Sequence, residues 1–245
     1  SGNLISKQVK GLNGEITNFS YSSENQLLSF KVFEPGNSNP VKEVTYAYDA
    51  LGRRISKQVI DHRAESDLTK TFTRRYIYDG GEILLEYNGS NQLLARYTHS
   101  SLRTDDVLAV DIKQAGVDQK LAKATGTYTY LKDALGSIID ITDDSGNKVQ
   151  HYIYSAFGMI LGIQDAFGAE IIADPKVATS YTFAGREFDS ESGYYCNRAR
   201  YYDSASGRFL QKDPEPGSQD NPMAVNNSYI YGNNSPGMYT DPSGR

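Results

Sequence analysis

The fold of this chain is decided by residues 46–55, which read YAYDALGRRI. The two tyrosines are one residue apart, so on a strand both rings point to the same face of a sheet. Asp49 and Gly52 then predict a turn, because an aspartate side chain bonds nearby backbone amides and glycine tolerates a positive φ. A second strand is predicted at residues 55–60. The stretch therefore predicts a complete β-hairpin.

The same plan recurs along the chain. A single hairpin cannot bury an aromatic face alone, but stacked hairpins can, and they then form a long twisted sheet that curls. The prediction is an all-β fold of repeated hairpins. The other strong copies are residues 76–85 (YIYDGGEILL), 128–139 (YTYLKDALGSII) and 152–160 (YIYSAFGMI), and weaker turns fall at residues 23–28, 89–94 and 143–147.

Composition agrees with an aromatic β-protein. The chain has 245 residues with 19 Tyr, 22 Gly, no Trp and only 38% hydrophobic residues, so tyrosine supplies much of the core. A net charge of -5 without a basic run argues against a general nucleic-acid binder. No apolar stretch reaches the roughly 18 residues that span a bilayer. The single cysteine, Cys196, excludes an internal disulfide and is interpreted as a small buried hydrophobe.

Helical signal is scarce, and the usual enzyme motifs are absent. Residues 107–112 alternate like a strand, residues 115–124 predict one short helix, and residues 167–177 predict an insertion or a long loop. The chain has no nucleophile elbow, no phosphate-binding loop and no zinc-protease helix motif. Residues 140–146 fit a hairpin turn better than a calcium loop, because their carboxylates miss the required alternate positions. The histidines suggest no metal set, and neither a cofactor nor a metal is predicted.

The last quarter of the chain carries an ordered set of motifs that is not a simple repeat. This order resembles the RHS repeat-associated core domain, and the upstream Tyr-Asp units resemble the YD repeats of the same family. A chance match of this length is very improbable, unlike a match to one short motif. The motifs are FAGREFD (183–189), GYYCNRARYYD (193–203), GRFL (207–210), DP (213–214), YIYGNNSP (229–236) and DPSGR (241–245).

The resemblance implies a hollow β-shell. Residues 1–180 are then hairpin repeats of the shell wall, in a C-terminal fragment of a longer shell. Residues 181–245 are the core domain, a plug that closes one end. Family members include bacterial RHS and contact-dependent toxins, the C components of Tc toxins, and the animal teneurins. In the toxins, a variable C-terminal toxin domain is held inside the shell, and the protein is secreted or delivered at the cell surface.

Three functions follow from the resemblance. The first is a shell that encapsulates a toxin and interacts with its cargo, with the remaining shell segments and with delivery proteins. The second is a non-proteolytic extracellular adhesion or partner-binding module, as in teneurins. The third is an incomplete shell assembled with a partner chain. None of them requires the shell itself to bind nucleic acid or to span a membrane.

The resemblance also implies aspartyl-type self-cleavage, carried by Asp213 and Asp241. Two neighbouring carboxylates push their pKa values apart, so that one can activate water while the other donates a proton. The cleavage position would be Gly244 and Arg245, although the family usually has Leu at the place of Arg245. The alternative is that both Asp-Pro pairs are ordinary turns, and whether the chain is an enzyme stays open.

Three arginines are candidate charge partners for this carboxylate pair. They are Arg208 of GRF and Arg198 and Arg200, which stand close before the Tyr-Tyr pair. In the alternative interpretation they pair with Asp189 or Asp203 and hold the plug together.

Overall fold

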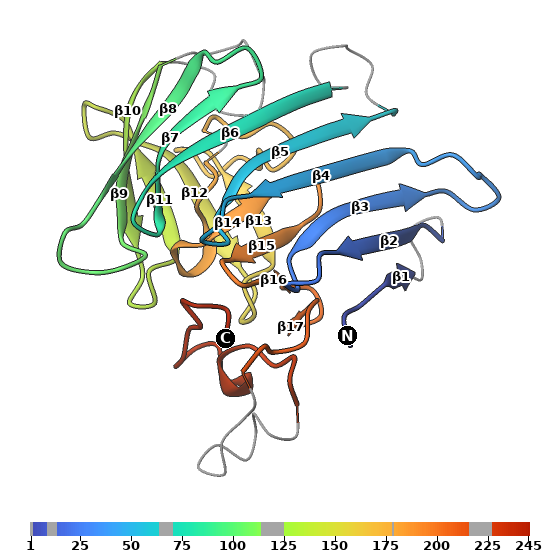
Figure 1. The fold of residues 1–245 in the computed structure, drawn as a ribbon. Helices are drawn as coiled ribbons and strands as arrows, with labels where there is room; N and C mark the ends of the chain where they lie inside the picture. Colours follow the sequence, from blue (N-terminus) through green and yellow to red (C-terminus); the bar gives the residue numbers. More distant parts are fainter. Residues whose placement is uncertain (1, 9–13, 64–70, 114–124, 178, 216–226) are drawn as a thin grey trace.

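The computed structural model describes residues 2–8, 14–63, 71–113, 125–177, 179–215 and 227–245. Within these ranges, thirteen strands form one antiparallel sheet whose strand order follows the sequence. This long sheet curls around strands of the terminal segment, residues 181–245 (Figure 1). Its strands are β1 (Ser6–Gln8), β2 (Ile16–Tyr21), β3 (Leu27–Phe33), β4 (Lys42–Tyr48), β5 (Arg54–Asp61), β6 (Thr71–Asp79), β7 (Glu82–Asn88), β8 (Leu93–His99), β9 (Val107–Ile112), β10 (Gly126–Lys132), β11 (Ile138–Thr142), β12 (Lys148–Tyr154) and β13 (Ile160–Gln164).

One kind of turn joins most of the hairpins. In the β4–β5 turn, the Gly52 N–H donates to the Asp49 carbonyl oxygen, and the Asp49 N–H donates to the Arg53 carbonyl oxygen, each at 3.0 Å. A side-chain oxygen of Asp49 also accepts from the amides of Leu51 and Arg53. The fourth residue has a positive φ, which favours Gly or Asn there. The same backbone pair of bonds recurs in the turns that begin at Ser22, Asn88, Asp133, Asp143, Ser155 and Asp165.

Tyrosine hydroxyls join several of the hairpins to the one before them. The Tyr48 hydroxyl donates to the Leu27 carbonyl oxygen at 2.7 Å, so β4 is fixed to the first residue of β3. The pairing register shifts next to this tyrosine, between Ala47 and Tyr48. Because the bulge turns the ring toward the preceding hairpin, the second tyrosine of the repeat has a specific structural role. The same bond is made by Tyr21 to Leu4, Tyr78 to Arg54 and Tyr154 to Ile138.

Two hairpins use other side chains for this bond. The Lys132 Nζ donates to the Val107 carbonyl oxygen at 2.9 Å, and the His99 Nε2 lies 2.8 Å from the Ile83 carbonyl oxygen. The copy predicted at residues 128–139 is therefore displaced by two positions, since Lys132 and not Tyr130 precedes the turn. The copy at residues 76–85 also differs, because Asp79 pairs directly with Glu82 across a two-residue turn.

The terminal segment forms a second antiparallel sheet that is buried on both faces. In β15 and β16 the adjacent tyrosines point to opposite faces, as the period of a strand requires. Tyr194 and Tyr201 pack against aromatic residues of the long sheet, whereas Tyr195 and Tyr202 pack with Tyr231 in a separate cluster. The strands are β14 (Glu187–Asp189), β15 (Tyr194–Asn197), β16 (Arg200–Asp203) and β17 (Arg208–Phe209), with 3-10 turns η1 (Phe183–Gly185) and η2 (Gly232–Asn234).

The all-β fold of repeated hairpins is confirmed. The strand predicted at residues 107–112 is β9, and the turn predicted within residues 140–146 joins β11 to β12. The loop predicted at residues 167–177 was placed too early, since residues 165–169 complete a hairpin turn and Glu170 bridges to Gln164. In the described part of the chain β1 and β13 remain edge strands, so these strands do not close a shell by themselves.

The short helix predicted at residues 115–124 lies outside the described residues. The described residues contain no helix long and apolar enough to cross a membrane.

Candidate functional site

Arg200, the first residue of β16, connects the two predicted aspartates. Its Nη2 lies 3.0 Å from an Asp213 carboxylate oxygen and 3.2 Å from an Asp241 carboxylate oxygen. The side chain is 1% exposed, and the guanidinium stacks 3.7 Å from the centroid of the Phe209 ring. The chain thus brings Asp213 and Asp241 together on one buried cation.

Arg200 also binds the backbone of the predicted cleavage position. Its Nε donates to the Gly244 carbonyl oxygen at 2.5 Å, and its Nη1 donates to the Ser228 carbonyl oxygen at 3.0 Å. Four acceptors therefore surround one planar group. Only a guanidinium offers five donors in a fixed plane, so lysine could not replace it.

Asp241 folds the last residues of the chain into a tight turn. Its Oδ1 accepts from the Gly244 N–H at 2.8 Å and from the Arg245 N–H at 3.2 Å. Burial raises the pKa of the Asp241 carboxyl above its usual value, although Arg200 and these amides oppose the rise. Gly244 has a φ of +69°, and an added Cβ would overlap the Asn197 carbonyl oxygen. A glycine is therefore required at this position.

The other two candidate arginines form no described ion pair with Asp213 or Asp241. Arg208 is exposed, and its Nη1 lies 3.3 Å from Asn227 Oδ1. Arg198 pairs with Glu82 and Asp105 of the long sheet and donates to the Pro242 carbonyl oxygen at 2.7 Å. Of the three arginines, Arg200 alone contacts Asp213 or Asp241 among the described ion pairs.

The predicted pairing of these arginines with Asp189 or Asp203 is wrong. Asp189 accepts from Arg54 at 2.5 Å and from Lys57 at 2.7 Å, both on β5. Asp203 pairs with Lys7 of β1. The cations that pair with these two carboxylates thus lie on the long sheet and not in the terminal segment. Sequence reasoning could not find these partners, because they are separated by more than 130 positions.

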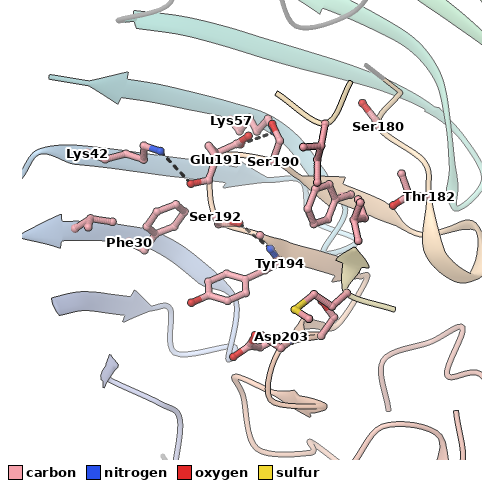
Figure 2. Close-up of a pocket in the computed structure, with 18 of the residues that line it drawn as sticks. Phe30, Lys42, Lys57, Ser180, Thr182, Ser190, Glu191, Ser192, Tyr194 and Asp203 are labelled. Carbon is pink, nitrogen blue, oxygen red and sulfur yellow. Dashed lines mark hydrogen bonds and ion pairs between the residues drawn. The ribbon is translucent and has the colours of Figure 1, made fainter. Parts of the chain in front are cut away.

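A cavity of about 630 Å³ lies between the long sheet and the terminal segment. Figure 2 shows that Lys42 and Lys57 of the long sheet face Glu191 and Ser192 of the terminal segment there. Lys57 Nζ lies 2.5 Å from the Glu191 carboxylate, and Lys42 Nζ donates to the Glu191 carbonyl oxygen at 3.3 Å. Tyr194 adds an aromatic wall. The described residues contain no group of three or more His, Cys, Asp or Glu that could hold a metal ion.

Similarity to known proteins was found over almost the whole chain. No family model matches it. It is 31% identical over 228 residues to the tRNA nuclease WapA of Bacillus subtilis (strain 168), covering 92% of this chain and 8% of that protein. It is 26% identical over 220 residues to the double-stranded DNA deaminase toxin A of Burkholderia cenocepacia, covering 87% of this chain and 14% of that protein. The chain belongs to the RHS/YD-repeat family.

Solved structures share the fold of this RHS/YD-repeat chain. A crystal structure of TcdB2-TccC3-Cdc42 superposes with a TM-score of 0.68 at 19% identity, over 93% of this chain and 10% of that chain. At this identity the likeness shows a shared fold. The chain spans under a sixth of the length of the nuclease and of the deaminase toxin. The family includes polymorphic toxins that act in bacterial competition.

The RHS/YD-repeat motifs contain one further candidate residue, to which the sequence assigned no role. Arg186 of FAGREFD is buried and donates to the Pro242 carbonyl oxygen at 2.8 Å. Its place in the ordered motif could have identified it. Glu82 and Asp105 offered no such signal, because their partners lie in the distant terminal segment.

Proposed function

We propose that this chain is the C-terminal part of an RHS/YD-repeat shell that encapsulates a C-terminal toxin cargo. Residues 1–180 form the wall and residues 181–245 the core-domain plug, and the remaining shell is completed by further segments. The curl of the long sheet and the cavity beside the terminal segment support this proposal. Two relatives named as a tRNA nuclease and a DNA deaminase toxin support a toxin cargo and delivery outside the producing cell.

The proposal includes self-cleavage of the Gly244–Arg245 bond. Asp213 accepts a proton from a water molecule whose oxygen attacks the Gly244 carbonyl carbon. The Arg200 Nε, 2.5 Å from the Gly244 carbonyl oxygen, stabilises the negative charge that develops on it. In the resting chain the Arg245 N–H donates to Asp241 Oδ1 at 3.2 Å. Once water has added to the carbonyl carbon, this nitrogen is pyramidal and carries a lone pair, and protonated Asp241, whose pKa is raised by burial, donates its proton to it. The bond breaks, and Asp213 returns its proton to Asp241.

One observation carries this proposal: a single buried guanidinium contacts both aspartates and the carbonyl oxygen of the proposed scissile bond. An ordinary Asp-Pro turn would not need this convergence. Arg245 in place of Leu is compatible with the chemistry, because its side chain is 56% exposed and pairs with Glu215. The charge at this position is therefore not buried.

Self-cleavage is tested with a reporter domain fused after Arg245. On a denaturing gel the wild-type fusion should yield the free reporter, and mass spectrometry should find a new C-terminus at Gly244. Asp241→Asn, Asp213→Asn and Arg200→Lys should each leave the fusion intact. Arg208→Gln is the matched control, since Arg208 is exposed and its described side-chain hydrogen bond goes to Asn227 and not to either aspartate.

Two outcomes would overturn the cleavage proposal. The first is a wild-type fusion that remains intact, which would favour a non-proteolytic adhesion or partner-binding module of the teneurin type. The second is a fusion that is cut equally well in the Asp241→Asn variant. Encapsulation is tested separately by protease resistance of the reporter in the full-length shell.

A further inference from the structure

Two arginines of the terminal segment converge on one carbonyl oxygen beside the proposed cleavage site. The Pro242 carbonyl oxygen accepts from Arg186 Nη1 at 2.8 Å and from Arg198 Nη1 at 2.7 Å. Pro242 directly follows Asp241 and stands two residues before Gly244. Its position therefore influences both the carboxylate and the scissile carbonyl.

The long sheet supplies the carboxylates that hold these arginines. Asp105, in the β8–β9 connection, lies 3.0 Å from Arg186 Nη1 and 2.7 Å from Arg198 Nη2. Glu82, the first residue of β7, lies 2.7 Å from Arg198 Nη2. The Asp105 backbone N–H donates to Glu82 Oε1 at 3.2 Å, so the Glu82 carboxylate also fixes the backbone of Asp105.

Burial and local geometry distinguish this network from surface ion pairs. The side chains of Arg186 and Asp105 are 4% and 9% exposed. Asp105 has a φ of +61°, an uncommon conformation for an aspartate in a loop. Gly81 lies beside the guanidinium of Arg198, and a Cβ there would come within 3.3 Å of it. The neighbouring residues therefore restrict where Arg198 can lie.

We propose that Glu82 and Asp105 are positioning residues for self-cleavage, which they serve by holding Arg186 and Arg198 on the Pro242 carbonyl oxygen. The inference rests on the proposed function. Arg200 fixes the segment 241–245 from within the terminal segment, and the two wall carboxylates fix it from the long sheet. The cleavage geometry is therefore complete only when the hairpins of Glu82 and Asp105 have folded and the terminal segment has docked on them.

The matched test compares Asp105→Asn with Asp106→Asn. The two aspartates are adjacent, but Asp106 pairs with Lys132 of the long sheet. In the reporter fusion, Asp105→Asn should slow cleavage on the order of 10- to 100-fold, since small misplacements of reacting groups have effects of this size. Asp106→Asn should cleave at the wild-type rate. Asp105→Glu, which retains the charge, should recover part of the lost rate.

A second measurement does not depend on cleavage. In the unfused chain, the Gly244 and Arg245 amides donate hydrogen bonds to Asp241. Their hydrogen exchange should be faster in Asp105→Asn and in Glu82→Gln than in the wild type, but unchanged in Asp106→Asn. Amides of β2 and β3 should exchange as in the wild type in all variants, which shows that the sheet is folded. If Asp105→Asn disrupts folding, Glu82→Gln provides the test.

The outcomes separate the two proposals. If the wild-type fusion is not cut, self-cleavage fails, and the exchange of the two amides still decides whether the wall carboxylates position the segment. If the fusion is cut but Asp105→Asn and Glu82→Gln match Asp106→Asn in both measurements, self-cleavage stands and the positioning role is overturned.

Discussion

The long sheet and the terminal segment are stabilised by different kinds of interaction. Adjacent strands of the long sheet are joined by backbone ladders, by turns of one design and by tyrosine hydroxyls that bind the preceding hairpin. The terminal segment instead depends on buried charged groups whose partners lie far away in the sequence. Examples are Asp189 with Arg54 and Arg186 with Asp105.

This difference has a thermodynamic consequence. A lost hairpin bond affects two neighbouring strands, and the remaining ladder still holds them. A lost partner of a buried ion pair leaves an uncompensated charge in the interior, which costs several times more. Substitutions at the boundary between the two regions should therefore have much larger effects than substitutions within a hairpin.

The largest effect is expected for Arg54→Met. Arg54 is buried and pairs with Glu187 at 2.7 Å and with Asp189 at 2.5 Å, so its removal takes the cation from Glu187 and leaves Asp189 with Lys57. We expect the free energy of unfolding, measured by denaturant titration, to fall by about 3–5 kcal/mol. The adjacent Arg53→Met is the control and should cost less than about 1 kcal/mol, because Arg53 pairs with Asp49 of its own exposed turn. Equal losses would contradict the distinction between the two regions.

The next effect separates a turn from its contact with the terminal segment. Gly146 and Gly158 occupy the same turn position with φ values of +80° and +83°. Gly146→Ala meets open space and should cost about 1–2 kcal/mol for the left-handed backbone alone. Gly158→Ala would also overlap the Phe183 ring, which adds about 1–3 kcal/mol. Thermal unfolding of both variants measures the difference in stability. Identical losses of stability would show that the Phe183 ring moves aside without cost.

The third effect depends on pH. Burial raises the pKa of Asp105 to about 6, although Arg186 and Arg198 oppose the rise and Glu82 adds to it. The folded state therefore binds this proton more tightly than the unfolded state, and the resulting stability is lost as pH rises from about 4 to about 6. The stability of the wild type relative to Asp105→Asn should fall by about 2–3 kcal/mol over this window.

Denaturant titrations of both proteins at constant ionic strength measure this change. The facing charged groups Glu82, Arg186 and Arg198 remain in both proteins, and Asp106→Asn should follow the wild-type curve. A constant difference between wild type and Asp105→Asn would refute the prediction.

The smallest effect lies within the long sheet. Tyr48→Phe removes the hydroxyl that donates to the Leu27 carbonyl oxygen but keeps the ring. We expect a loss of about 1 kcal/mol in unfolding free energy. A similar loss is expected for Tyr78→Phe and Tyr154→Phe, because each substitution removes the equivalent hydrogen bond. Tyr239→Phe is the control, since that residue is exposed. A loss no larger than that of the control would show that the hydroxyl does not stabilise the sheet.

The sequence predicts the hairpins because their signals are local. Asp49 and Gly52 define their own turn within four residues, and the alternating tyrosines define the buried face. The copy at Tyr128 was displaced because Lys132 makes the bond usually made by tyrosine, and no periodicity of aromatic residues can reveal that. A lysine amine and a tyrosine hydroxyl can each bind the equivalent carbonyl oxygen of the preceding hairpin.

The candidate site was predictable only through the family resemblance. The motif order identified Asp213, Asp241 and Arg200, which the structure places together. It did not distinguish Arg200 from Arg198, because their roles depend on which acceptors surround each guanidinium. Those acceptors come from loops and hairpins far along the chain, and their approach is set by the packing of the terminal segment on the long sheet.

The tyrosine bonds of the long sheet all point backward along the chain. Tyr48 binds Leu27, Tyr78 binds Arg54 and Tyr154 binds Ile138. During synthesis each hairpin can therefore dock on a finished neighbour as soon as it leaves the ribosome, without waiting for later sequence. The terminal segment has the opposite dependence, since its charged groups need hairpins made long before. Formation of the long sheet and docking of the terminal segment are thus ordered in time by the direction of translation.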